Sequence, residues 1–83
     1  MATPIDNVTL KRLTTTTTLE NKSMVSVLNS HATETLTISS DGGSQAISLS
    51  SGQSITLSSA VGFTLPDIEI GISGSGTAEV IYQ

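Results

Sequence analysis

The chain has 83 residues, seven acidic and three basic side chains and a net charge of −4, which is enough for one small domain. Three basic residues are too few for the positively charged surface that binds nucleic acid. Without cysteine there is no disulfide, thiolate zinc site or cysteine nucleophile. No apolar run approaches the ~20 residues of a membrane-spanning helix. We therefore expect neither nucleic acid nor a membrane as a partner.

Apolar and polar residues alternate along most of the chain, which is the pattern of half-buried strands. Serine and threonine fill 27 of the 83 positions, and threonine suits a pleated surface. No segment has the apolar spacing of a helix. In chain order, the predicted strands are 8–13, 15–19, 24–29, 34–39, 46–49, 54–58, 68–72 and 77–82.

The alternation also predicts which side chains face inward. Within 15–19 nothing is obviously buried, whereas the later strands bury pairs of aliphatic side chains on one face. These pairs are Val25 and Val27, Leu36 and Ile38, Ile47 and Leu49, and Ile55 and Leu57. Asp41, Gly42 and Gly43 supply a tight reversal, and residues 62–66 form a corner, because Pro66 cannot donate a hydrogen bond within a central strand.

Six strong strands and one or two weaker ones, at a spacing of roughly 8–12 residues, are typical of a sandwich or barrel. We predict an all-β fold: a small antiparallel β-sandwich of six to eight short strands, with a jelly roll as one candidate topology and no significant helix. Residues 1–23 form an N-terminal arm or the first edge strands, and residues 24–83 form the sandwich domain.

Residue types that carry chemistry are few. The single histidine, His31, falls between two predicted strands, and its combination with one of 14 serines into a catalytic triad has no specificity. Asp67 and Glu69 alternate with Ile68 and Ile70, which indicates the solvated face of a strand. We expect no catalytic residue, cofactor or metal ion, and no enzyme activity.

The run of threonines is the least ordinary feature. We interpret it either as an uncharged edge strand or arm that docks on a neighbour through backbone hydrogen bonds, or as a solvent-facing strand of the domain. Because so small a core without crosslinks gains stability from association, we also expect oligomers. The predicted contacts with a partner are Leu10, Leu13, Thr14, Thr15, Thr16, Thr17 and Thr18.

In residues 25–83, short predicted strands rich in aliphatic residues alternate with turns rich in glycine and serine. This pattern includes Leu-Thr-Ile-Ser-Ser-Asp-Gly-Gly at 36–43, Ile-Ser-Leu-Ser-Ser-Gly-Gln-Ser-Ile-Thr-Leu at 47–57 and Gly-Ser-Gly-Thr-Ala-Glu-Val-Ile-Tyr at 74–82. This sequence pattern resembles that of small virion structural proteins of tailed bacteriophages, most of all capsid decoration (cement) proteins. Receptor-binding and baseplate domains of phages share it.

The resemblance implies a non-enzymatic protein on the outer capsid surface that bridges neighbouring subunits of the major capsid protein, often as a homotrimer. Residues 1–23 would then be an arm along the capsid. The N-terminus lacks the pattern of a signal peptide, so we expect assembly in the host cytoplasm. The alternative is a binding module of a phage tail, fibre or baseplate that recognises a receptor or carbohydrate.

Overall fold

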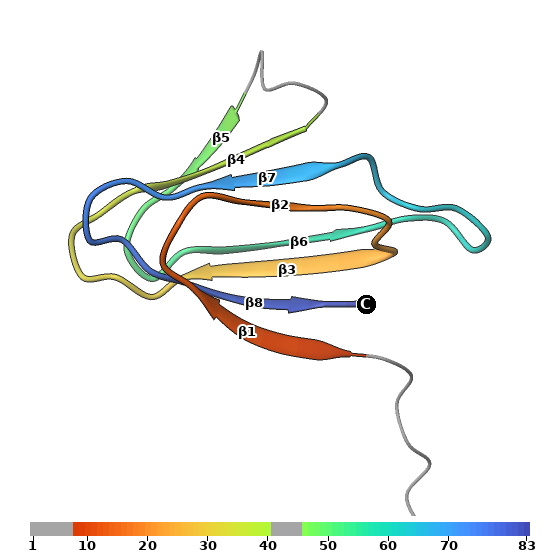
Figure 1. Cartoon of the computed structure of the whole chain (residues 1–83), viewed down its shortest axis with the longest axis horizontal. Coiled ribbons are helices and arrows are strands. Elements are labelled where there is room, and N and C mark those ends of the chain that lie inside the picture. The colour runs from red at the N-terminus through yellow and green to blue at the C-terminus, as the bar shows by residue number, and fades with distance from the viewer. Residues whose placement is uncertain (1–7, 41–45) are drawn as a thin grey trace, which may run out of the picture.

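The computed structural model describes residues 8–40 and 46–83, and their regular structure is entirely β (Figure 1). The predicted turn at Asp41–Gly43 and the first seven residues of the predicted N-terminal segment lie outside this range. The prediction of an all-β fold is confirmed. The strands are β1 (Thr9–Leu13), β2 (Thr17–Leu19), β3 (Met24–Asn29), β4 (Leu36–Ser40), β5 (Ala46–Leu49), β6 (Ser54–Ser58), β7 (Ile68–Gly71) and β8 (Ala78–Tyr82).

The strands form two antiparallel sheets of four. Sheet A has the order β1-β8-β3-β6, and sheet B has the order β2-β7-β4-β5. Apart from the β4–β5 hairpin, each strand is followed by a strand of the other sheet, and the last strand returns to pair with the first. This strand order is that of a jelly roll. In the described part of the chain, no helix is long and apolar enough to cross a membrane.

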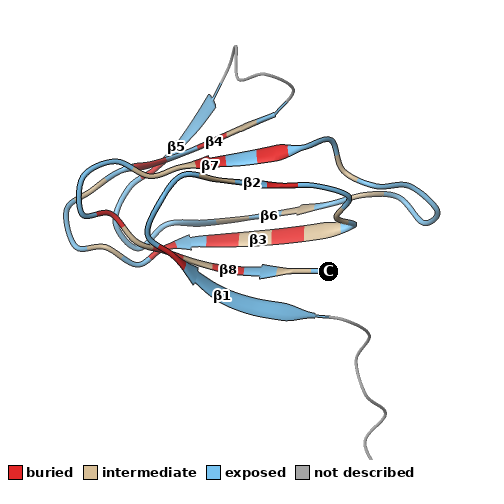
Figure 2. Cartoon of the chain, viewed as in Figure 1, coloured by how far each residue is buried: buried red, intermediate tan, exposed pale blue. Residues whose placement is uncertain are grey.

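The core lies between the sheets and consists of the inward-facing aliphatic residues that the alternation predicts. Figure 2 shows buried residues alternating with intermediate or exposed ones along β3 and β7. Val25, Val27 and Leu36 are fully buried, as are Ile70 and Val80. The remaining core residues are Leu13, Leu19, Ile38, Leu49, Ile68 and Ala78. Each contributes through the removal of apolar surface from water.

Three burial predictions need correction. Ile47, expected inside, is 51% exposed, because β5 is an edge strand of sheet B and has a neighbour on one side only. Ile55 and Leu57 do pack against the core but are half-buried, since β6 is the edge of sheet A. Conversely, Leu19 is buried, because β2 pairs with β7 and brings it opposite Ile68.

Backbone hydrogen bonds close one end of the sandwich by joining the β2–β3 turn to the loop between β6 and β7. The amide of Leu65 donates to the carbonyl of Lys22 at 2.7 Å, and the amide of Ser59 donates to that of Ser23 at 2.9 Å. The turn itself has Asn21 in the left-handed region, at φ 57°, which asparagine tolerates better than most residues. The loop of residues 59–67 is thereby anchored at both of its sides.

Candidate interaction surfaces

The two outer faces of the sandwich differ in chemistry. Sheet A carries exposed aliphatic side chains on its outer face, and Leu10 is the most exposed of them at 73%. We call this group the sheet A patch; it comprises Val8, Leu10, Leu28 and Ile81. Sheet B instead presents small or polar side chains outward: Thr18, Thr37, Ser39, Ala46, Ser48 and Glu69.

Strand register relates three members of the sheet A patch, which come from three strands, and Val8 directly precedes β1. Leu10 of β1 lies opposite Ile81 of β8, and Leu28 of β3 lies opposite Glu79, two residues before Ile81. Figure 2 shows β1 exposed along most of its length, at the edge of the sheet. Leu10 and Ile81 are therefore direct neighbours, and Leu28 is the diagonal neighbour of Ile81; apolar groups gathered on an outer face mark an interaction site more often than scattered ones do.

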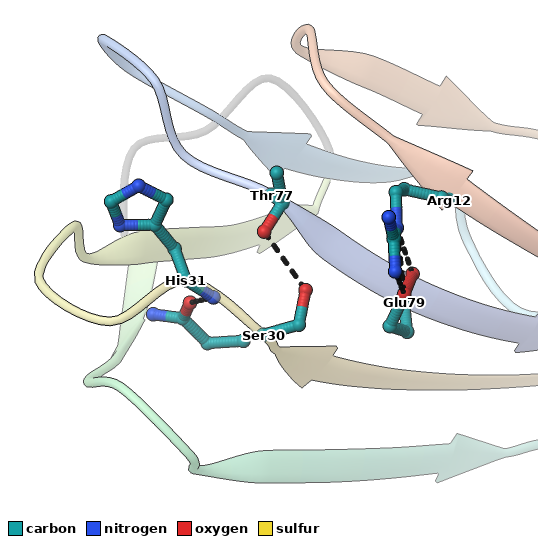
Figure 3. A network of polar contacts seen from close by, with 6 residues as sticks. Arg12, Ser30, His31, Thr77 and Glu79 are labelled. Carbon is teal, nitrogen blue, oxygen red and sulfur yellow. Dashed lines mark hydrogen bonds and ion pairs between the residues drawn. The ribbon is translucent and has the colours of Figure 1, made fainter.

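An ion pair lies among the residues of the sheet A patch, because Glu79 is opposite both Arg12 and Leu28. The Nε of Arg12 donates to both carboxylate oxygens of Glu79, at 2.7 and 3.1 Å, and Nη2 donates to Oε1 as well (Figure 3). The hydrogen bond from Arg12 lowers the pKa of Glu79, and Glu79 in turn raises the pKa of Arg12. The two charges of this pair compensate each other on the outer face of sheet A.

The residues predicted as partner contacts do not share one surface. Leu10 is exposed on the outer face of sheet A, whereas Leu13, at 5% exposure, belongs to the core. Residues 14–16 connect β1 with β2 and so cross from sheet A to sheet B, while Thr17 and Thr18 belong to β2. Only Leu10 of this set therefore contributes to the sheet A patch.

One threonine of the run fastens the β1–β2 connection to the rest of the sandwich. The hydroxyl of Thr16 accepts a hydrogen bond from the amide of Ile72 at 3.1 Å and donates to its carbonyl at 3.2 Å. Thr17 donates from its hydroxyl to the carbonyl of Thr15 at 2.9 Å. In the described structure, then, this part of the run bonds within the domain.

The sandwich contains a buried polar residue that the sequence reasoning did not single out. Asn29, at the end of β3, is fully buried. Its Nδ2 donates to the carbonyls of Glu34 at 2.7 Å and Leu49 at 2.9 Å, and its Oδ1 accepts from the amide of His31 at 3.0 Å. The alternation of the sequence could have indicated this burial, because Asn29 occupies the next inward position after Val25 and Val27.

His31 lies in the loop between β3 and β4, as predicted, and its ring organises that loop. Nδ1 accepts from the amides of Thr33 at 3.1 Å and Glu34 at 3.0 Å, so the proton of the neutral ring is on Nε2, which lies 3.3 Å from the Ser75 hydroxyl. Figure 3 shows this region, with Ser30 bonded to Thr77 beside it. These contacts give His31 a structural role.

Among the acidic residues of the described chain, Glu34 shares the loop of His31, and its amide donates to the His31 ring. Asp67 and Glu69, in contrast, lie just before and within β7. The loop that carries His31 and the loop that carries Asp67 are at opposite ends of the sandwich in Figure 1. Glu69 is exposed on β7, as the alternation predicted. Across residues 8–40 and 46–83, no cluster of three His, Cys, Asp or Glu residues could hold a metal ion.

Two further apolar features lie outside the sheet A patch. An open groove of about 390 Å³ follows the side of the sandwich formed by β5 and β6, and it is lined by Ile38, Ile47 and Leu57 among others. In the 59–67 loop, Val61 is fully exposed and Phe63 is 70% exposed. The turn at this tip has Gly62 at φ 87° and a bond from the amide of Phe63 to the carbonyl of Ala60.

Comparisons of the chain with models of protein families, with curated proteins and with solved structures gave no match.

Proposed function

We propose that the chain is a non-enzymatic structural protein of a tailed-phage virion, a decoration protein that binds the outer capsid surface and bridges neighbouring subunits of the major capsid protein. The observation that supports this most is the asymmetry of the sandwich. One outer face carries the sheet A patch, with Leu10 73% exposed, and the other is polar. A domain with one apolar face is suited to lie flat on a larger surface.

The energetics favour binding to a repetitive surface. Full burial of one aliphatic side chain contributes about 1.5–3 kcal/mol, and association itself costs several kcal/mol. The few side chains of the sheet A patch therefore give weak binding to an isolated partner. On a shell, where each bound unit can engage neighbouring sites, weak contacts combine through effective concentration. The jelly-roll order adds support at the level of fold, since viral capsid and lectin domains use it, although fold alone does not assign function.

The second candidate is a binding module of a phage tail, fibre or baseplate. The exposed tip of the 59–67 loop favours it, because Val61 and Phe63 project apolar side chains from a turn. An aromatic ring at a loop tip can stack on a sugar or enter a pocket. In this case recognition would depend on the loop and not on the outer face of sheet A.

Sedimentation separates the two candidates. Labelled chain is mixed with tail-less shells, and in parallel with isolated tails, from a phage strain in which the gene is deleted. We expect saturable pelleting with shells, loss of pelleting for Leu10→Lys, and retention for Phe63→Ser. Thr37→Lys is the matched control, since it adds the same charge at an exposed outward position of sheet B. Pelleting with tails alone, lost in Phe63→Ser, would establish the second candidate.

A further inference from the structure

Strand β6 is an open edge of sheet A. Among the residues that the structure describes, only β3 pairs with it, so its second side presents unpaired backbone groups that can accept another strand. Edge strands are commonly protected by charged residues, proline or a bulge. The five residues of β6, Ser-Ile-Thr-Leu-Ser, contain neither charge nor proline, and the strand keeps a regular register with β3 from Met24–Ser58 to Leu28–Ser54.

The sequence of β6 is complementary to itself. Hydroxyl and aliphatic residues alternate symmetrically around Thr56. In an antiparallel pairing of two copies centred there, Thr56 meets its own counterpart, Ile55 meets Leu57, and Ser54 meets Ser58. Paired residues project to the same face of a sheet, so aliphatic pairs lie on the inner side and hydroxyl pairs on the outer side. The existing bond between the hydroxyls of Ser26 and Thr56, at 3.0 Å, already belongs to such an outer row.

The other edge strands lack this match. In β1, an antiparallel pairing about its midpoint would place Lys11 opposite its own counterpart, which is unfavourable for like charges. Strand β2 has only three residues. In β5, a pairing about the midpoint of its four residues places Ile47 opposite Ser48, and thus an inward side chain opposite an outward one. Of the four edges, as far as residues 8–40 and 46–83 define them, β6 is the one whose midpoint pairing matches every residue in kind.

We propose that two copies of the chain pair antiparallel through β6, about a twofold axis at Thr56, and form one continuous eight-stranded sheet. Ile55 and Leu57, half-buried at the edge of the isolated chain, gain neighbours across the axis. The groove on the β5–β6 side and the exposed Ile47 then adjoin the second copy. This proposal does not depend on shell binding.

The symmetry has a consequence for the proposed function. A twofold contact uses the same strand on both chains and closes at two copies, in contrast with the homotrimer that the family resemblance implies. Because the axis is perpendicular to the sheet, both copies of the sheet A patch remain on the same outer face. The dimer is therefore bivalent, which is what a protein needs in order to bridge two capsid subunits.

Solution mass tests the pairing. We expect a particle near 17 kDa, twice the 8.5 kDa of the chain, at micromolar concentration by light scattering. Thr56→Lys and Thr56→Glu each place like charges opposite one another and should halve the mass. An equimolar mixture of the two variants should restore it, because the introduced lysine then faces the introduced glutamate. Thr37→Lys introduces the same side chain on sheet B and should remain dimeric. Circular dichroism checks that each variant is folded.

Crosslinking tests the register without relying on a charge. The chain has no cysteine, and directly opposed residues of an antiparallel pair have Cα atoms about 4.5–5.5 Å apart, within reach of a disulfide. Mild oxidation should convert Thr56→Cys to a covalent dimer and leave Thr37→Cys monomeric on a non-reducing gel. The proposal is overturned by a monomeric or trimeric wild-type chain, or by a dimer that Leu10→Lys dissociates and Thr56→Lys does not.

Discussion

Asn29 and Leu49 connect the two sheets through a buried hydrogen bond. The Nδ2 of Asn29, at the end of β3 in sheet A, donates to the carbonyl of Leu49, at the end of β5 in sheet B, at 2.9 Å. The same amide group bonds the carbonyl of Glu34, just before β4. One side chain thus holds three segments together at the end of a core that is otherwise aliphatic.

Replacement of Asn29 should destabilise the fold strongly. Asn29→Ala removes the side-chain donor to one buried and one part-buried carbonyl, which we expect to lower the free energy of unfolding by about 2–3 kcal/mol. Asn29→Asp should be worse, because it places a buried charge against two carbonyl oxygens. Urea unfolding measures both, with Ser48→Ala, at an exposed position of β5, as the control. An Asn29→Asp variant as stable as wild type would show that the amide does not bridge the sheets.

His31 should contribute through its Nδ1 atom. His31→Ala removes the acceptor for the amides of Thr33 and Glu34, and we expect a loss of about 1 kcal/mol. His31→Asn should recover much of this, because its side-chain oxygen can accept near the position of Nδ1. Thermal unfolding of the two variants makes the comparison. Equal losses in both would mean that the ring acts by packing and not as an acceptor.

Replacement of two leucines three residues apart should change the free energy of unfolding by very different amounts. Leu10 is exposed on the outer face, and Leu13 is in the core. Leu13→Ala should therefore cost about 2–3 kcal/mol of unfolding free energy, whereas Leu10→Ala should change it by less than about 0.5 kcal/mol. Denaturant unfolding of both variants checks the prediction. A large loss in Leu10→Ala would mean that this residue stabilises the isolated domain.

The Arg12–Glu79 pair should make the free energy of unfolding depend on pH in the acid range. Because the folded chain lowers the pKa of Glu79, the unfolded chain binds a proton more readily at this site. The contribution is fully present above the ordinary glutamate pKa of about 4.3 and is lost as the pH falls through the lower folded pKa. The stability difference between wild type and Glu79→Gln should shrink on acidification. A pH-independent difference would be inconsistent with the pair, as would insensitivity to salt.

Local alternation was sufficient to predict the positions of the strands. Leu36 and Ile38 face inward as expected, because a strand's side chains alternate regardless of its neighbours. The alternation did not predict which strands are edges, since that follows from long-range pairings such as β1 with β8. For this reason the prediction that Ile47 is buried was wrong, and the burial of Leu19 was not predicted.

Part of the candidate surface could have been found from the sequence. Val27–Leu28 and Val80–Ile81 are adjacent apolar residues, so one member of each pair must face outward. Both outward residues belong to the sheet A patch. Their convergence with Leu10 depends on strand order, however, and no local pattern carries that information. The same holds for Thr16, whose bonds to Ile72 join positions 56 residues apart.

Cryo-electron microscopy of shells from the gene-deleted phage strain, incubated with the purified chain, tests the proposed function most directly. We predict added density on the outer capsid surface that fits pairs of chains, with the outer face of sheet A and Leu10 against the shell and with each pair spanning two capsid subunits. Shells that remain bare, or density that contacts the shell only through the polar face of sheet B, would contradict it.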